Sequence, residues 1–108
     1  MIRVTVFKED GKYVSFICDG HAGYAKHGED IVCAAVSMLV INTVNSILEF
    51  TDDKIDVSSD EDRGLISVDF KNSPSERAKL LMDSMVLGLS GVKEEYDGRY
   101  IDISVKEE

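Results

Sequence analysis

The segment of residues 30–50 constrains the fold more than any other part of the chain. It contains neither glycine nor proline, and its apolar residues recur at helical spacing. These residues are Ile31, Ala34, Ala35, Met38, Leu39, Ile41, Val44, Ile47 and Leu48, and the stripe is widened by Val32, Val36 and Val40. We therefore predict a largely buried helix, covered by a sheet or partly by a second subunit, with Asp30 or the preceding Gly28 as its N-cap.

Five short segments are rich in β-branched and aromatic residues, which predicts strands. They are residues 2–7, 13–18, 54–57, 65–70 and 99–105. The first two are joined by Glu9-Asp10-Gly11, a hairpin signal of the Asp-Gly type. Strict alternation along the second strand predicts two faces, with Val14, Phe16 and Cys18 on one and Tyr13, Ser15, Ile17 and Asp19 on the other.

A second helix is predicted to start at Ser73-Pro74-Ser75-Glu76. Ser73 fits the N-cap, Pro74 the first helical position and Glu76 the reciprocal capping partner. The helix then has one apolar face, and Gly91 provides a C-terminal stop. The residues of that face are Ala78, Leu81, Met82, Met85 and Leu89.

The resulting order, ββαββαβ, predicts an α+β fold of two layers, in which two helices cover one face of a mostly antiparallel sheet. The chain has 108 residues and shows no internal repeat or linker, so we expect a single domain over residues 1–108. No stretch reads as long and uncharged enough to cross a bilayer, and the N-terminus lacks the layout of a signal peptide. We therefore expect a cytoplasmic protein with no membrane partner.

The chain is acidic, with a formal net charge of -9. Acidic residues cluster at Asp52-Asp53, Asp60-Glu61-Asp62, Glu94-Glu95 and Glu107-Glu108. Such a surface repels phosphate backbones, which argues against direct nucleic-acid binding. It is typical of a soluble protein, and it also suits an enzyme that attracts a basic protein substrate. Both interpretations stay open.

Cys33 is a candidate nucleophile for peptide hydrolysis, which requires that its thiolate be favoured. The residue falls in the first turn of the predicted helix, where unpaired N–H groups and the helix dipole would lower its pKa. The same N–H groups would hold the oxyanion of a tetrahedral intermediate. His21, twelve residues earlier by number, would be the base that takes the thiol proton.

The glycine-rich loop of residues 20–28 is expected to bring His21 back to the helix start. It matches neither phosphate-binding glycine pattern, so we interpret it as a mobile flap over an extended peptide. The substrate-facing residues of this loop are Gly20, Ala22, Gly23 and Gly28. Ser37, one turn beyond Cys33, would donate a hydrogen bond into the site. Asp19 and Asp30 are the nearby carboxylates that would orient His21; the sequence does not choose between them, and a bare dyad without an acid is the third alternative.

The same residues allow other interpretations. Cys33 can be an inert buried cysteine and His21 a solvated loop residue, which is the simpler interpretation of the residues alone. Cys18, His21, His27 and Cys33 have the side-chain types of a zinc site, although their spacing is not that of a standard finger. Cys18 and Cys33 can also form a disulfide, but a cytosolic chain normally keeps its cysteines reduced. We expect neither a metal nor another cofactor.

A resemblance to a known family bears on this choice. The run Gly20-His21-Ala22, followed by Gly28-Glu29-Asp30-Ile31-Val32-Cys33-Ala34-Ala35-Val36-Ser37, resembles the signature of the ribosomal-processing cysteine proteases, the Prp family. The likeness extends over nearly the whole chain. It implies a dyad of His21 and Cys33, a homodimer, and a basic substrate, the N-terminally extended form of large-subunit ribosomal protein twenty-seven. Sequences of this family vary at residues 24–27, so no role carries over to that segment.

With the resemblance added, we expect a cysteine endopeptidase that cleaves an extended, apolar peptide segment by acyl-enzyme chemistry. Two alternatives belong to other classes of protein. One is a non-catalytic dimeric binding module for a ribosomal protein, and the other is a metal-binding protein.

Overall fold

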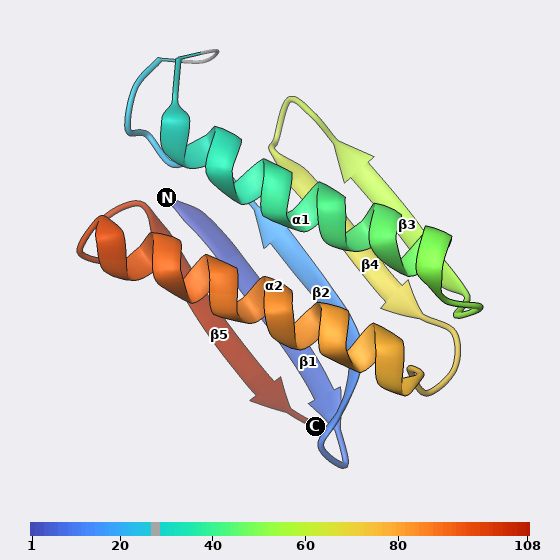
Figure 1. The fold of residues 1–108 in the computed structure, drawn as a ribbon. Coiled ribbons are helices and arrows are strands. Elements are labelled where there is room, and N and C mark those ends of the chain that lie inside the picture. Colours follow the sequence, from blue (N-terminus) through green and yellow to red (C-terminus); the bar gives the residue numbers. More distant parts are fainter. Residues whose placement is uncertain (27–28) are drawn as a thin grey trace.

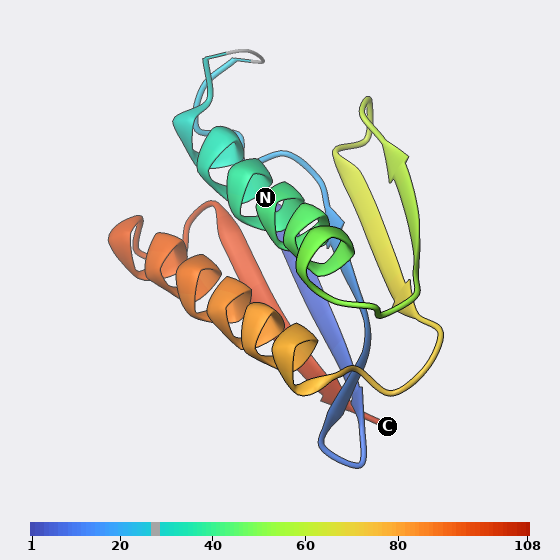
Figure 2. The ribbon, with the colours of Figure 1, turned by 45° about the vertical axis from the view of Figure 1, so that its right-hand side comes forward.

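In the computed structural model, which describes residues 1–26 and 29–108, one five-stranded sheet carries two helices on the same face (Figure 1). The elements are β1 (Ile2–Glu9), β2 (Lys12–Asp19), α1 (Ile31–Phe50), β3 (Ile55–Asp60), β4 (Leu65–Phe70), α2 (Glu76–Glu95) and β5 (Ile101–Glu107). The predicted order ββαββαβ and the two-layer α+β class are confirmed. Figure 2 shows the two helices side by side over the sheet, with the other face of the sheet left open.

The strand order in the sheet is β3-β4-β2-β1-β5. β1 pairs with β2, β2 with β4, and β3 with β4, all antiparallel. β5 is parallel to β1, because α2 carries the chain back across the sheet before β5 begins. The sheet is therefore mostly antiparallel, as predicted, and β2, which leads into the glycine-rich loop, lies at its centre.

The hairpin between β1 and β2 turns at Asp10 and Gly11, whose φ angles are 52° and 74°. Positive φ at two successive residues is the type I′ geometry that Asp-Gly favours. The predicted faces of β2 are wrong at its start, because a register shift lies between Phe7 and Lys8 of β1. Val14 has no partner there, so Tyr13 is buried in the core and Val14 is not.

Helix α1 packs a valine-rich face against the sheet, and its outer face is apolar and exposed. The buried residues are Val32, Val36, Val40, Thr43, Val44 and Ile47, whereas Met38, Ile41 and Leu48 are exposed. Because aliphatic residues occupy both faces of this 20-residue helix, its length and composition alone would suit a membrane span. The prediction that no such stretch exists is therefore wrong. The same composition suits a helix that packs on a sheet, as α1 does here.

Both predicted ends of α2 are wrong. The N-cap is Ser75, whose hydroxyl accepts a hydrogen bond from the N–H of Ala78, and Pro74 lies before the helix. The Ser75 N–H in turn donates to the carboxylate of Asp53 at 2.8 Å, which fixes the chain at this point. Gly91 does not stop the helix, which continues to Glu95 because Val92 and Tyr96 still pack against the core. The chain turns away only at residues 97–98, which have positive φ.

Candidate active site

The loop that leaves β2 passes over the N-terminus of α1 and beside the turn between β3 and β4. Gly20 has a φ of 100°, and a side chain there would collide with the carbonyl oxygen of Met1 at 2.6 Å. Gly64, in the β3–β4 turn, lies against the loop so closely that an added Cβ would be 2.5 Å from the oxygen of Gly20. Two glycines thus allow three segments of main chain to meet at the carboxyl end of β2.

Asp30 holds this loop to the helix. It is the N-cap of α1, and its Oδ1 accepts hydrogen bonds from the N–H groups of Val32 and Cys33 at 3.0 and 2.9 Å. Its Oδ2 accepts from the N–H groups of Tyr24 and Ala25 at 3.0 and 3.4 Å. Burial raises the pKa of Asp30, but the hydrogen bonds from backbone donors together lower it by more, so its pKa lies below the ordinary value. The predicted N-cap is confirmed, and one buried carboxylate joins two segments.

Cys33 is the third residue of α1 and is half-buried. Its Sγ accepts a hydrogen bond from the N–H of Ala22 at 3.1 Å, so the residue that follows His21 lies directly against the sulfur. The pKa of Cys33 is nevertheless raised, chiefly by burial and also by the charge of Asp30, while the Ala22 N–H lowers it in part. The expectation that the pKa is lowered at the helix start is therefore wrong, because burial outweighs the Ala22 N–H and the Asp30 carboxylate raises the pKa further.

The same carboxylate changes the expected oxyanion site. The N–H groups of Val32 and Cys33 donate to Asp30 Oδ1, and that of Ala34 donates to the Asp30 carbonyl oxygen at 3.0 Å. These three donors are thus engaged within the protein, so they do not support the predicted oxyanion site at the helix start. The donor beside the sulfur is Ala22 N–H, on the loop.

His21 is exposed, and its Nε2 lies 3.0 Å from the carbonyl oxygen of Asp62 in the β3–β4 turn. Since a carbonyl oxygen only accepts hydrogen bonds, Nε2 is the protonated nitrogen, and in the neutral ring Nδ1 keeps its lone pair. An added Cβ at Gly64 would lie 3.1 Å from His21 Cε1, so the ring rests against the same turn. The imidazole is therefore oriented by main chain from the β3–β4 turn.

His21 and Cys33 line one hollow of about 620 Å³ between α1 and the β3–β4 turn. Ser37 lines it one helical turn beyond Cys33, as predicted from its spacing, and Cys18 lines it from β2. Its other lining residues are Ile2, Gly20, Gly23, Ala25, Asp30, Ala34, Val36, Val40, Ile41, Ser59, Asp60, Glu61, Gly64, Leu65 and Ile66. The walls are mainly aliphatic, and the rim formed by the β3–β4 turn is acidic.

The remaining predicted residues have other surroundings. Asp19 pairs with Arg63 at 3.4 Å, and Ala22 is a buried residue of the loop. Cys18 and Cys33 are both free thiols, so the disulfide interpretation is wrong. His27 and Gly28 lie outside the described residues. Within residues 1–26 and 29–108, no group of three or more His, Cys, Asp or Glu side chains is arranged to hold a metal ion.

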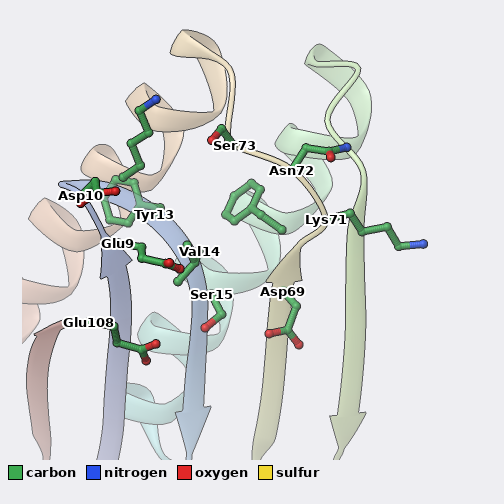
Figure 3. A pocket seen from close by; sticks show the side chains of 12 residues that line it. Glu9, Asp10, Tyr13, Val14, Ser15, Asp69, Lys71, Asn72, Ser73 and Glu108 are labelled. Atoms are coloured by element: carbon green, nitrogen blue, oxygen red, sulfur yellow. The ribbon is translucent and has the colours of Figure 1, made fainter.

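A second hollow, of about 570 Å³, lies at the other end of β2 (Figure 3). It is lined by Glu9, Asp10, Lys12, Tyr13, Val14, Ser15, Asp69, Phe70, Lys71, Asn72, Ser73 and Glu108. This set contains neither a cysteine nor a histidine, so the thiol and imidazole chemistry belongs to the hollow beside α1.

The Asp62 carbonyl and the Ala22 N–H were missed by the sequence analysis. Both are main-chain groups, and main-chain groups carry no residue-type signal. The nearest indication was Gly64, which is one of two glycines bounding the close contact between the β3–β4 turn and the loop.

Comparison with known proteins gives consistent matches over this chain. A family model described as cysteine protease Prp matches residues 1–102. The ribosomal processing cysteine protease Prp of Staphylococcus aureus is 31% identical over 96 residues, which is 89% of this chain and 90% of that protein. The Bacillus subtilis protein of the same description is 31% identical over 101 residues, with the same coverage.

Solved structures agree with the sequence matches. The S. aureus protease Prp in complex with a covalently linked product peptide has a TM-score of 0.92 and 32% identity, covering 98% of this chain and 100% of that one. The same protease in complex with a substrate peptide has a TM-score of 0.87 and 31% identity, with equal coverage.

Proposed function

The chain belongs to the Prp family of cysteine proteases, and from this premise we propose that it removes an N-terminal extension from a ribosomal protein, with Cys33 as nucleophile and His21 as base. The activity of the family is that of a cysteine-type peptidase, and its relatives are described as ribosomal processing proteases. One observation carries the assignment of residues: the N–H of Ala22, next to His21, lies 3.1 Å from Cys33 Sγ.

Acylation begins from the thiol, because the pKa of Cys33 is raised in the free enzyme. His21 Nδ1 takes the thiol proton as the sulfur attacks the peptide carbonyl carbon, which forms the C–S bond and places negative charge on the carbonyl oxygen. The N–H of Ala22, which donates to the sulfur in the free enzyme, is the donor that we assign to that oxyanion. The C–N bond then breaks, and the leaving amine takes the proton from His21.

Deacylation reverses these roles. His21 removes a proton from a water molecule, which attacks the thioester carbon. The C–S bond breaks, the amino-terminal fragment leaves with its new terminal carboxylate, and the proton returns to Cys33. The Asp62 carbonyl, which accepts from His21 Nε2, supports the ring through both steps because it stabilises the protonated imidazole.

The substrate is an extended, partly apolar peptide of a basic ribosomal protein. The aliphatic walls of the hollow suit apolar side chains, and the acidic Asp60 and Glu61 on its rim suit a basic chain. An S. aureus relative has been crystallised with substrate and product peptides. The extended form of large-subunit ribosomal protein twenty-seven, implied by the family resemblance, is the substrate that we propose.

The enzyme acts as a cytoplasmic homodimer in this proposal. Support for the dimer comes from the exposed apolar residues of the helical layer, namely Met38, Ile41, Leu48, Leu80 and Leu87. Two free cysteines are in keeping with a reducing compartment.

Incubation with the extended ribosomal protein tests this function. We expect the wild-type enzyme to cleave once, and both Cys33→Ala and His21→Ala to lose cleavage while keeping the wild-type circular dichroism spectrum. Cys18→Ala removes the other thiol of the hollow and is the matched control, which should still cleave. Cleavage by Cys33→Ala would rule out Cys33 as the nucleophile. If folded wild-type enzyme left the extended ribosomal protein uncleaved, that protein would be ruled out as the substrate.

A further inference from the structure

Tyr24 lies on the glycine-rich loop, three residues after His21, and its ring contacts Tyr96 at the end of α2 and Tyr100 just before β5. The ring centroid lies 5.6 Å from that of Tyr96 and 5.2 Å from that of Tyr100, with interplanar angles of 77° and 79°. Tyr96 and Tyr100 contact each other at 6.0 Å and 75°. The three rings thus make mutual edge-to-face contacts, the arrangement that aromatic quadrupoles favour.

Tyr96 and Tyr100 lie at the two ends of the connection between α2 and β5, and hydrogen bonds join both to the fold. Tyr96 is the C-cap of α2, and its N–H donates to the carbonyl of Val92. The carbonyl of Tyr100 accepts from the N–H of Ile2 at 2.9 Å, which joins the start of β5 to β1. Both rings are half-buried against the hydrophobic core. The two tyrosines therefore form a fixed platform, and the Tyr24 ring attaches the loop to it.

The loop is consequently held at two points, one through its main chain and one through a side chain. The Asp30 carboxylate binds the main chain of Tyr24 and Ala25, and the tyrosine platform binds the Tyr24 side chain. Between Tyr24 and β2 lie His21 and Ala22, whose N–H is 3.1 Å from Cys33 Sγ. Tyr24 itself does not line the hollow, although Gly23 and Ala25 on either side of it do.

We propose that Tyr24, seated on Tyr96 and Tyr100, is a positioning residue that holds His21 and the Ala22 N–H at Cys33. The inference rests on the proposed function for its kinetic effect, but the placement of the loop is measurable without substrate. The hydroxyl of Tyr24 has no part in it, since the ring contacts alone carry the attachment. The residue acts through the loop and not on the peptide, because it is outside the lining of the hollow.

The kinetic test compares Tyr24→Ala, Tyr24→Phe and Lys26→Ala with the wild-type enzyme on the extended ribosomal protein. Removal of two ring contacts should lower kcat of Tyr24→Ala about tenfold, with KM within about twofold. Tyr24→Phe keeps the ring and should keep wild-type kcat. Lys26→Ala, a loop control that loses only an exposed ion pair with Glu29, should do the same.

Hydrogen exchange at the Ala22 amide provides the readout that needs no substrate. We expect exchange at this amide to be about tenfold faster in Tyr24→Ala than in wild-type protein, and unchanged in Tyr24→Phe. Tyr24→Leu is a second variant with a larger side chain than alanine, and it should show an intermediate rate. Core amides of β1 and β2 should keep their protection, which separates a loop effect from general destabilisation.

Three results would overturn the proposal: wild-type exchange at Ala22 in Tyr24→Ala, a loss of activity confined to KM, or equal impairment of Tyr24→Phe. A failure of the proposed function would look different. In that case the wild-type enzyme would not cleave, while the exchange experiment would still decide whether Tyr24 fixes the loop.

Discussion

The two cysteines of this chain line the same hollow but differ in what surrounds each sulfur. Cys18 lies on β2 between Val4 of β1 and Ile66 of β4, and only 6% of its surface is exposed. Burial raises its pKa to about 11. Cys33 is half-buried at the start of a helix and receives the Ala22 N–H at 3.1 Å. Since the pKa of both thiols is raised, what separates them is access and a backbone donor.

The largest expected effect comes from exchanging sulfur for oxygen at Cys33. Cys33→Ser keeps an acceptor for the Ala22 N–H, but a hydroxyl is a much weaker nucleophile than a thiol at neutral pH. We expect kcat to fall by about 1000-fold or more, with an unfolding free energy within about 0.5 kcal/mol of wild type. Cleavage kinetics and urea unfolding measure the two quantities. A Cys33→Ser enzyme with wild-type kcat would show that the reaction does not need the Cys33 sulfur.

The reciprocal substitution, Cys18→Ser, should affect stability and spare activity. It places a hydroxyl where the thiol packs among core side chains, which should lower the unfolding free energy by about 1–3 kcal/mol. The kcat of the folded enzyme should stay within about threefold of wild type. Cys18→Ala, which removes the sulfur without burying a polar group, serves as the control in urea unfolding. A large loss of kcat at full stability would show that Cys18 takes part in the chemistry.

Asp30→Asn should change the pKa of Cys33 and leave that of Cys18 unaffected, because Asp30 acts on Cys33 and not on Cys18. The charge of Asp30 raises the pKa of Cys33, so its removal should lower that pKa, and the pH midpoint of Cys33 alkylation should move down. With asparagine Oδ1 kept at Val32 and Cys33, the Nδ2 group faces the N–H groups of Tyr24 and Ala25 and cannot accept from them, so the unfolding free energy should fall by about 0.5–2 kcal/mol. An upward shift of the alkylation midpoint would contradict this account of the site's electrostatics.

The smallest effect concerns acid. Because the folded-state pKa of Asp30 lies below its ordinary value, its contribution to stability is present above the unfolded-state pKa and is lost as pH falls through the folded-state pKa. The stability difference between wild type and Asp30→Asn, measured by urea unfolding, should therefore be constant near neutral pH and shrink in acid. A difference that grows in acid would mean that the pKa of Asp30 is higher in the folded state than in the unfolded chain.

The sequence predicted the order of elements because its periodicities are local and clear. The spacing of apolar residues marked α1, the Asp-Gly turn marked the first hairpin, and Asp30 marked the start of α1. The errors arose where packing overrode local signals. A β-bulge exchanged the faces of Tyr13 and Val14, and core contacts of Val92 carried α2 past Gly91.

The candidate residues came from the sequence, but their connections did not. The resemblance to the Prp family selected Cys33 and His21 over the simpler interpretation of an inert cysteine and a solvated histidine, and their roles stay predictions. The hydrogen bonds that surround them involve the N–H of Ala22 and the carbonyl of Asp62, which are main-chain groups brought together by tertiary structure. The sequence indicated the Asp30 N-cap but not the burial of Cys33 in the folded chain, and burial is the chief cause of its raised pKa.

The central claim is that Cys33 alone supplies the reacting sulfur, and site-resolved alkylation tests it most directly. The enzyme is treated with iodoacetamide at neutral pH, and mass spectrometry of its peptides is followed together with residual cleavage of the extended ribosomal protein. We predict that the label accumulates on Cys33 before Cys18 and that cleavage falls in proportion to the Cys33 label. Full labelling of Cys33 with undiminished cleavage would contradict the account.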